Sequence, residues 1–162
     1  MSETPRWLDA DELAAWMPLG GMLMALPNAL ESQLKRDADL SLFGYFVLVG
    51  LSESPDRTLP MSTLAGFASG SLSRLSHAVA KLEREGWVER RPSPEDGRIT
   101  IATLTDAGFA KLEKTAPGHV ETVRRLVVDR LTPDQLQAVG AAARIITDGL
   151  LGPCDPTAET SR

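Results

Sequence analysis

The first forty residues carry apolar side chains at intervals of three and four, a spacing that places them on one face of a helix. The pattern predicts a helix over about residues 9–36. Because a proline removes a backbone donor and crowds the carbonyl four residues earlier, we expect a break near Pro18 and a kink near Pro27. The stripe is longer than one small domain can cover alone, so a partner subunit is expected to cover part of it. Its members are Leu13, Trp16, Leu19, Leu23, Leu26, Leu30 and Leu34.

Residues 13–30 contain no charged side chain, and a stretch of about 17–25 apolar residues is enough to cross a bilayer. Prolines, glycines and Asn28 interrupt the segment, and mostly acidic residues flank it. A buried helix or subunit interface is therefore favoured, with a membrane span as the alternative. The residues before it are mainly acidic where a secretion signal needs basic ones, so no signal is expected. The single cysteine, Cys154, excludes an internal disulfide framework and favours the cytoplasm.

A short apolar run, FGYFVLVGL at 43–51, has the aromatic and β-branched content of a strand. A helix is preferred, because Ser41 is suited to cap one and the flanking segments are helical. The turn-forming residues of 52–60 end this element. Two short helices are then predicted over 62–68 and 72–85.

Serines are expected to begin these two helices, and a glycine is expected to end the second. Ser62 and Ser71 are suited to cap them, and Gly86 ends the second. Two strands, 87–91 and 99–104, flank the loop PSPEDGR, whose Asp-Gly pair is typical of a hairpin turn. This order predicts a mainly α fold with a small β-hairpin wing, the winged helix-turn-helix.

The last third of the chain is predicted to be helical. One helix starts at the cap Thr105 and runs to about residue 130, disturbed at Pro117-Gly118. A second runs over 132–151, with Pro133 in its first turn. Residues 152–162 are predicted to be a disordered tail.

The net charge is −5, which argues against binding to phosphates unless the charge is unevenly distributed. Residues 71–98 carry six basic and five acidic side chains, and every other part of the chain has a negative balance. The local field governs docking on nucleic acid. The one positive segment is therefore the candidate for DNA contact.

The predicted helix over 72–85 has two faces when wound at about 100° per residue. The apolar face is expected to pack on the domain and holds Leu72, Leu75, Ala78, Val79 and Leu82. Small hydroxyls and bases on the other face suit a helix that enters the major groove. The alternative is an ordinary solvated helix face. The polar face holds Ser73, Arg74, Ser76, His77, Ala80, Lys81 and Arg84.

The predicted hairpin strengthens the DNA interpretation. Arg90 and Arg91 end its first strand, and Arg98 follows the Asp96-Gly97 turn. An arginine at the wing tip can enter the narrow minor groove, and Asp96 can hold Arg98 extended through a charge-assisted hydrogen bond. The alternative is a surface hairpin with an incidental ion pair.

Residues 72–108 resemble the recognition helix and wing of the MarR family of bacterial regulators. The most specific element is the pattern D-x-R-x(5)-L-T-x-x-G, met by Asp96, Arg98, Leu104, Thr105 and Gly108. The similarity extends through FGYFVLVGLSES at 43–54 and LAGFA at 64–68, and it covers about residues 10–150. Trp87, where a smaller aliphatic is commoner, and Pro27 depart from the family pattern.

The resemblance implies a homodimer on a palindromic site in double-stranded DNA. No cofactor or metal is expected. It divides the chain into an N-terminal dimerisation helix (9–40), a winged helix-turn-helix domain (41–108) and C-terminal dimerisation helices (109–151). Members are typically repressors released by small aromatic or lipophilic effectors. The resulting DNA-binding prediction comprises Ser71, Ser73, Arg74, Ser76, His77, Lys81, Arg84, Arg91, Asp96, Gly97 and Arg98. The effector-site prediction comprises Trp16, Leu23, Phe43 and Phe46.

Two other classes of function remain open at this stage. One is a winged helix used for protein–protein contact without DNA, which the acidic total charge supports. The other is a small-molecule binding protein with vestigial DNA affinity. No phosphate loop, nucleophile elbow or paired carboxylates indicate catalysis, and the chain is not expected to be an enzyme.

Three remaining residues have less specific interpretations. Cys154 is either a redox sensor or, as favoured, an incidental thiol, since nothing basic flanks it. His77 and His119 lack partners at metal-ligand spacing. His119 is expected to be a capping or interface residue.

Overall fold

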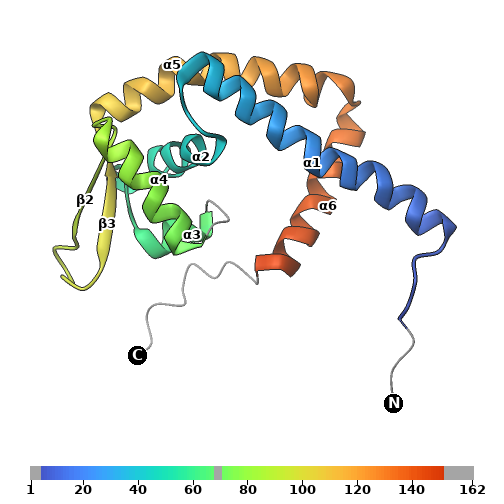
Figure 1. Cartoon of the computed structure of the whole chain (residues 1–162), viewed down its shortest axis with the longest axis horizontal. Coiled ribbons are helices and arrows are strands. Elements are labelled where there is room, and N and C mark those ends of the chain that lie inside the picture. The colour runs from blue at the N-terminus through green and yellow to red at the C-terminus, as the bar shows by residue number, and fades with distance from the viewer. Residues whose placement is uncertain (1–4, 68–70, 152–162) are drawn as a thin grey trace.

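The elements follow one another in the order of a winged helix-turn-helix with helical extensions at both ends (Figure 1). The structure is a computed structural model that describes residues 5–67 and 71–151. The predicted tail and Cys154 lie outside the described residues. The elements are α1 (Ala10–Ala38), α2 (Leu42–Ser52), the 3₁₀ turn η1 (Pro55–Arg57), β1 (Thr58–Pro60), α3 (Met61–Phe67), α4 (Leu72–Arg84), β2 (Val88–Pro92), β3 (Thr100–Leu104), α5 (Asp106–Leu126), the 3₁₀ turn η2 (Val128–Arg130) and α6 (Pro133–Leu151).

Side-chain caps begin most of the helices where the sequence predicts them. Ser41, Ser71 and Thr105 each accept a hydrogen bond from the backbone N–H three residues later, at the starts of α2, α4 and α5. Asp9 forms a capping box with Glu12 at the start of α1. The expected cap at Ser62 is wrong, because α3 already begins at Met61.

The wing belongs to a three-stranded antiparallel sheet of order β1-β3-β2. In the hairpin Val88 pairs with Leu104 and Pro92 with Thr100, while Thr58 of β1 pairs with Thr103. β1 was not predicted, since residues 52–60 read as a turn. Three residues ending in a proline carry no alternating pattern, and only the pairing with β3 makes them a strand.

The core lies between α2, α3, α4 and the sheet, with the C-terminal end of α1 on top. Its fully buried side chains include Leu34, Leu40, Val47, Leu48, Leu51, Leu64, Leu75, Val79, Leu82 and Val88. Burial of this size holds α4 rigidly against the lobe and fixes which of its faces meets solvent.

Two long helices run through their prolines. The expected break near Pro18 is wrong, and α5 continues through Pro117. The three prolines in the interiors of α1 and α5, Pro18, Pro27 and Pro117, are exposed. The carbonyls that lose their partners therefore lie on accessible faces, where water can bond them.

The two ends of the molecule differ in character. Figure 1 shows α4 and the wing at one end, and the N-terminal half of α1 extending from the other, with α6 between them and behind. Among the described residues, α1 is the one helix long and apolar enough to cross a membrane by length and composition. Many of the apolar side chains of α1 and α6 are exposed in the single chain.

Candidate nucleic-acid interface

α4 presents a polar face to solvent because its apolar positions are fixed in the core. Leu75, Val79 and Leu82 are buried. The exposed predicted residues are Ser71, Ser73, Arg74, His77 and Arg84, while Ser76 and Lys81 are partly exposed. The apolar-face prediction is wrong at one position: Leu72, the first residue of α4, remains 55% exposed. Leu72 lies in the first turn of α4, before the helix packs against the core.

The wing carries an arginine held in place by its own turn. Arg98 donates from Nε to Asp96 Oδ1 at 3.1 Å and from Nη2 to Asp96 Oδ2 at 3.1 Å, and its backbone N–H donates to Asp96 Oδ1 at 3.0 Å. The side chain of Arg98 is 92% exposed. These hydrogen bonds hold the pKa of the Asp96 carboxyl below its ordinary value. The turn thus presents a preoriented cation to solvent, as the sequence predicts.

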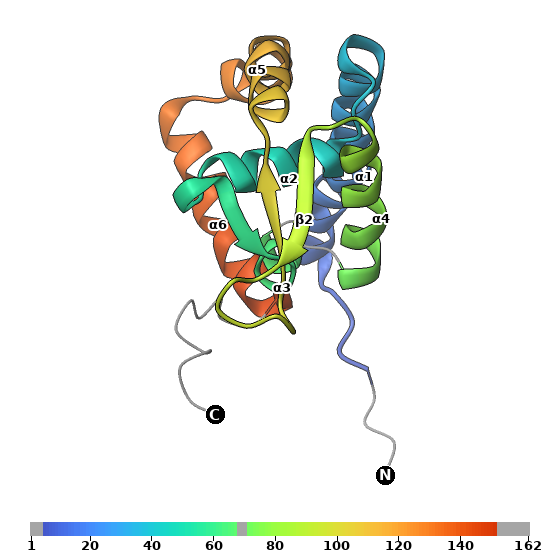
Figure 2. The same ribbon diagram turned by 90° about the vertical axis from the view of Figure 1, so that its left-hand side faces the viewer.

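α4 and the wing share one hollow. A cavity of about 370 Å³ is lined by Met61, Ser62, Leu72, Ser76, Arg90, Arg98, Ile99 and Thr100. Figure 2, seen from the wing end, shows α4 beside β2 with the hairpin loop beyond the end of the strand. Ser76 of the helix and Arg98 of the wing therefore lie on the same face of the lobe.

A salt bridge that sequence reasoning missed joins these two parts. Arg90 of β2 donates from Nε to Glu83 Oε2 at 3.0 Å and from its backbone N–H to Glu83 Oε1 at 3.0 Å. Both side chains are 30% exposed. The hydrogen bonds from Arg90 lower the pKa of the Glu83 carboxyl. The signal in the sequence was an acid and a base seven apart across the Gly86 turn, which brings the end of α4 back along β2.

The L-T-x-x-G part of the motif fixes the base of the wing. Thr105 Oγ1 donates to the Gly86 carbonyl at 2.7 Å and accepts from the Gly108 N–H at 3.0 Å. A Cβ on Gly108 would lie 2.1 Å from the Trp87 carbonyl oxygen, so only glycine fits. Gly86 has φ +73°, which favours glycine at the end of α4. The motif thus sets how α5 leaves the sheet.

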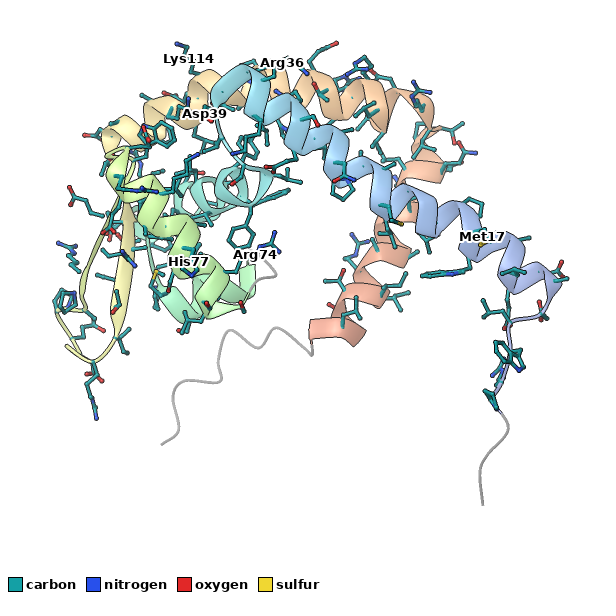
Figure 3. The ribbon with its side chains drawn as sticks, in the orientation of Figure 1. Met17, Arg36, Asp39, Arg74, His77 and Lys114 are labelled. Carbon is teal, nitrogen blue, oxygen red and sulfur yellow. The ribbon has the colours of Figure 1, made fainter. Side chains whose placement is uncertain are left out.

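Arg74 connects α4 to a second cavity. Its Cζ lies 4.5 Å from the centroid of the Phe43 ring on α2. Figure 3 shows Arg74 and His77 on α4, far from Met17 on the extended part of α1. The cavity has a volume of about 650 Å³ and is lined by Pro27, Asn28, Glu31, Ser41, Leu42, Phe43, Phe46, Arg74 and Ala78.

The structure brings together part of the predicted effector set. Phe43 and Phe46 line the 650 Å³ cavity, whereas Trp16 and Leu23 lie on α1 outside its lining, 50% and 55% exposed. Nothing in the sequence pointed to Pro27 and Glu31 as lining residues, because the crossing of α1 over α2 places them there. Glu31 Oε2 accepts a hydrogen bond from the Leu42 N–H, which ties α1 to the start of α2 beside the cavity.

The remaining residues of the DNA-binding prediction lie around the edge of the polar face of α4. Lys81 Nζ is 4.0 Å from Asp39 Oδ1, which draws it toward the turn between α1 and α2. Arg84 lies at the end of α4 and Arg91 on β2, both exposed. Gly97 is exposed at the wing tip, and a Cβ there would meet no atom within 4 Å. These bases therefore surround the polar face rather than forming its centre.

His119 has a structural place far from this face. His119 is a buried residue of α5 that faces α1 and α2. Its Nδ1 lies 3.2 Å from Gln33 Oε1 on α1, and its ring centroid lies 4.4 Å from that of Tyr45 on α2. Burial lowers the pKa of its imidazole. Within residues 5–67 and 71–151, no three His, Cys, Asp or Glu side chains gather as metal ligands would.

An exposed polar helix, a wing with a preoriented arginine and a shared hollow define a winged helix-turn-helix protein. Comparison with known proteins narrows this class: residues 40–100 match the model of the MarR family. Sco3205, a MarR family transcriptional regulator from Streptomyces coelicolor solved in complex with DNA, is 47% identical over 92% of this chain and 93% of its own, with a TM-score of 0.87. The chain belongs to the MarR family.

Two further relatives support this assignment. AbsC, a MarR family transcriptional regulator from the same organism, is 36% identical over 91% of this chain and 99% of its own, with a TM-score of 0.85. The transcriptional repressor IacR of Pseudomonas putida is 27% identical over 118 residues, which span 73% of this chain and 69% of that protein. Each of these relatives is a transcriptional regulator by name.

Proposed function

We propose that this protein is a sequence-specific DNA-binding transcriptional regulator, not an enzyme, that binds an inverted repeat as a homodimer. The observation that carries the proposal is the position of Ser76 and Arg98 on one hollow, which puts the polar face of α4 and the wing arginine on the same side. A helix in the major groove and an arginine in the adjacent minor groove need this arrangement. The relative solved with DNA supports it.

The homodimer is proposed from apolar surface that one chain leaves uncovered. Side chains on α1 and α6 are between 49% and 78% exposed, namely Trp16, Met17, Leu23, Met24, Ile145, Ile146 and Leu150. Monomeric soluble proteins rarely expose large apolar patches. We assign it to a second copy of the chain, in place of the membrane that the composition of α1 also allows, which fits a cytoplasmic protein.

Ile145→Glu tests this interface, because it places a charge at a position that is 75% exposed in the single chain. Sedimentation should show a folded monomer with much weaker DNA binding, whereas Lys114→Glu on the exposed side of α5 should leave a dimer. A dimeric Ile145→Glu protein would contradict the assignment.

An effector site is proposed in the 650 Å³ cavity. Phe43 and Phe46 offer aromatic contact, and Arg74 offers a cation to an anionic group. Because Arg74 belongs to α4, a ligand in this cavity would act on the helix that reads DNA. We propose that the protein is a repressor and that such a ligand releases it from DNA; its relative IacR is a transcriptional repressor by name.

Benzoate, the simplest aromatic carboxylate, is a suitable probe for the effector site. Titrated into a preformed protein–DNA complex, it should release the DNA, and Phe46→Ala should shift the titration to higher concentration. Binding of benzoate without any effect on DNA would favour the small-molecule binding protein over the ligand-responsive regulator.

Selection of binding sites from random DNA with the purified protein tests the central proposal. We expect an inverted repeat whose half-site centres lie about 34–36 Å apart, one helical turn. Arg98→Glu should abolish retention, while the matched reversal Lys114→Glu should not. No enriched repeat, together with tolerance of Arg98→Glu, would favour the protein–protein interaction module.

A further inference from the structure

Leu72 is a large aliphatic side chain in a place where the hydrophobic pattern predicts burial and the structure shows exposure. It is the first residue of α4, and 55% of its surface is accessible. Single exposed leucines are common on protein surfaces and need no function by themselves. Leu72 differs because of what surrounds it.

The side chain lines the hollow between α4 and the wing. Leu72 shares this 370 Å³ cavity with Ser76, one helical turn further along α4, and with Arg98 and Ile99 of the wing. Ile99 is 40% exposed, so two accessible aliphatic side chains border the hollow. Polar side chains assigned to both grooves flank them, which makes the apolar patch continuous with the proposed DNA surface.

The charges around the hollow decide between its possible occupants. Arg90 is neutralised by Glu83, but Arg98 projects into solvent with 92% of its side chain exposed. A cation at the rim and hydroxyls on the helix favour a polyanion with polar edges over an apolar protein segment. The occupant is therefore DNA.

Duplex DNA offers one apolar group to a residue at the start of a recognition helix. In the major groove each base pair shows donors and acceptors, and thymine alone adds a C5 methyl group. The N-terminal residues of such a helix are those that reach base edges. The serines beside Leu72 can bond polar edges, whereas Leu72 cannot donate or accept and can contact only the methyl group.

We propose that Leu72 is a specificity-determining residue that reads the methyl group of a thymine at one fixed position in each half-site. The inference rests on the proposed DNA-binding function. The contact selects thymine through burial of an apolar group rather than through a hydrogen bond. Burial of one methyl group corresponds to about fourfold in affinity, and two half-sites in one dimer give about fifteenfold.

Deoxyuridine substitution in the selected DNA site isolates this contact, because it removes the methyl group and keeps every base-pairing edge. Each thymine pair related by the inverted repeat is replaced in turn, and affinity is measured by fluorescence anisotropy with the full chain. Replacing one particular thymine pair should lower the affinity of the wild-type protein about fifteenfold. Leu72→Ala should bind thymine and deoxyuridine sites equally well, with the affinity of wild type for the deoxyuridine site.

Ile99→Ala is the matched control, since it removes an exposed aliphatic side chain from the other edge of the same hollow. It should keep the full dependence on the methyl group. Leu72 is outside the core, so thermal unfolding should show that Leu72→Ala folds normally.

Three results would overturn the inference while leaving the proposed function in place. They are a bound site in which no thymine methyl group matters, a methyl dependence that persists in Leu72→Ala, and a dependence that disappears in Ile99→Ala instead. Failure of the wild-type protein to bind any DNA sequence would contradict the proposed function itself, and the inference with it.

Discussion

The guanidinium of Arg74 stacks on the ring of Phe43, with 4.5 Å between Cζ and the ring centroid. This contact joins the first turn of α4 to α2 at the edge of the 650 Å³ cavity. One side chain therefore belongs both to the helix assigned to DNA and to the wall of the site assigned to an effector. When DNA is bound, Arg74 is expected to leave the ring for a phosphate.

Phe43→Leu should tighten DNA binding by the dimer about five- to thirtyfold, because each of the two cation–π contacts at an accessible site is worth about 0.5–1 kcal/mol in the free protein. Affinity for the selected site, measured by anisotropy at fixed salt, checks this. Phe46→Leu is a suitable control, because Phe46 lines the same cavity but the cation–π contact of Arg74 is with Phe43. Equal effects of the two changes would show that Arg74 does not move between ring and DNA.

Arg98→Ala should weaken DNA binding and flatten its salt dependence. If the wing arginine neutralises a phosphate, the slope of log K against log salt should fall in magnitude by about 0.9 for each wing. Asp96→Asn should weaken binding less and leave the slope unchanged, because it removes the carboxylate that orients Arg98 but keeps the cation. An unaltered slope in Arg98→Ala would remove this residue from the interface.

Glu83→Ala should loosen the wing on α4. The two side chains of the Glu83–Arg90 pair are each only 30% exposed, so the change should lower the free energy of unfolding by about 1 kcal/mol. DNA affinity should also fall, since the wing would no longer be fixed relative to the helix. Glu85→Ala removes an exposed carboxylate two residues away. It should change neither the free energy of unfolding nor the DNA affinity. Chemical denaturation measures the first effect, and an equal loss in both variants would refute the assignment.

Stability should decrease as the pH falls below about 6.5, the ordinary pKa of histidine. Burial lowers the pKa of His119 in the folded chain, so the unfolded chain binds a proton first and unfolding becomes easier as pH falls. The contribution is complete above that pH. Asp96, Glu83 and Asp37, whose carboxyl pKa values are also lowered, act only in more acidic solution.

His119→Gln should flatten the change in melting temperature between pH 7 and pH 5, whereas His77→Gln should leave it as in wild type. His77 is exposed on α4 and tests the other histidine of the chain. A profile that His119→Gln does not alter would place the pH dependence elsewhere.

Local signals predicted the parts of the fold that local chemistry determines. Ser71 and Thr105 cap helices because their hydroxyls accept from the next turn, and the Asp96-Gly97 turn orients Arg98 within three residues. The strand β1 was missed because its ladder partner, Thr103, lies 45 positions away from Thr58. The break expected near Pro18 is wrong, since α1 runs without interruption from Ala10 to Ala38.

The candidate DNA-binding and effector sites were likewise predictable only where local sequence determines them. The polar face of α4 and the wing arginine follow from periodicity and a motif, but the exposure of Leu72 and the stacking of Arg74 on Phe43 depend on where other elements lie. Trp16 and Leu23 belong to the apolar stripe of α1, whereas the α1 residues that line the cavity, Pro27, Asn28 and Glu31, do not. Which face of α1 borders α2 is decided by how the two helices cross, and periodicity cannot show that.

Groove placement is tested most directly by DNA cleavage from iron–EDTA attached to single cysteines, introduced as Ser73→Cys or Gly97→Cys in a Cys154→Ser background. The account predicts cuts shifted toward the 5′ ends within each half-site from position 73 in the major groove. It predicts cuts shifted toward the 3′ ends in the adjacent minor groove from position 97. Diffuse cleavage from both positions, or a pattern identical to that of Lys114→Cys on α5, would contradict the assignment of α4 and the wing to DNA.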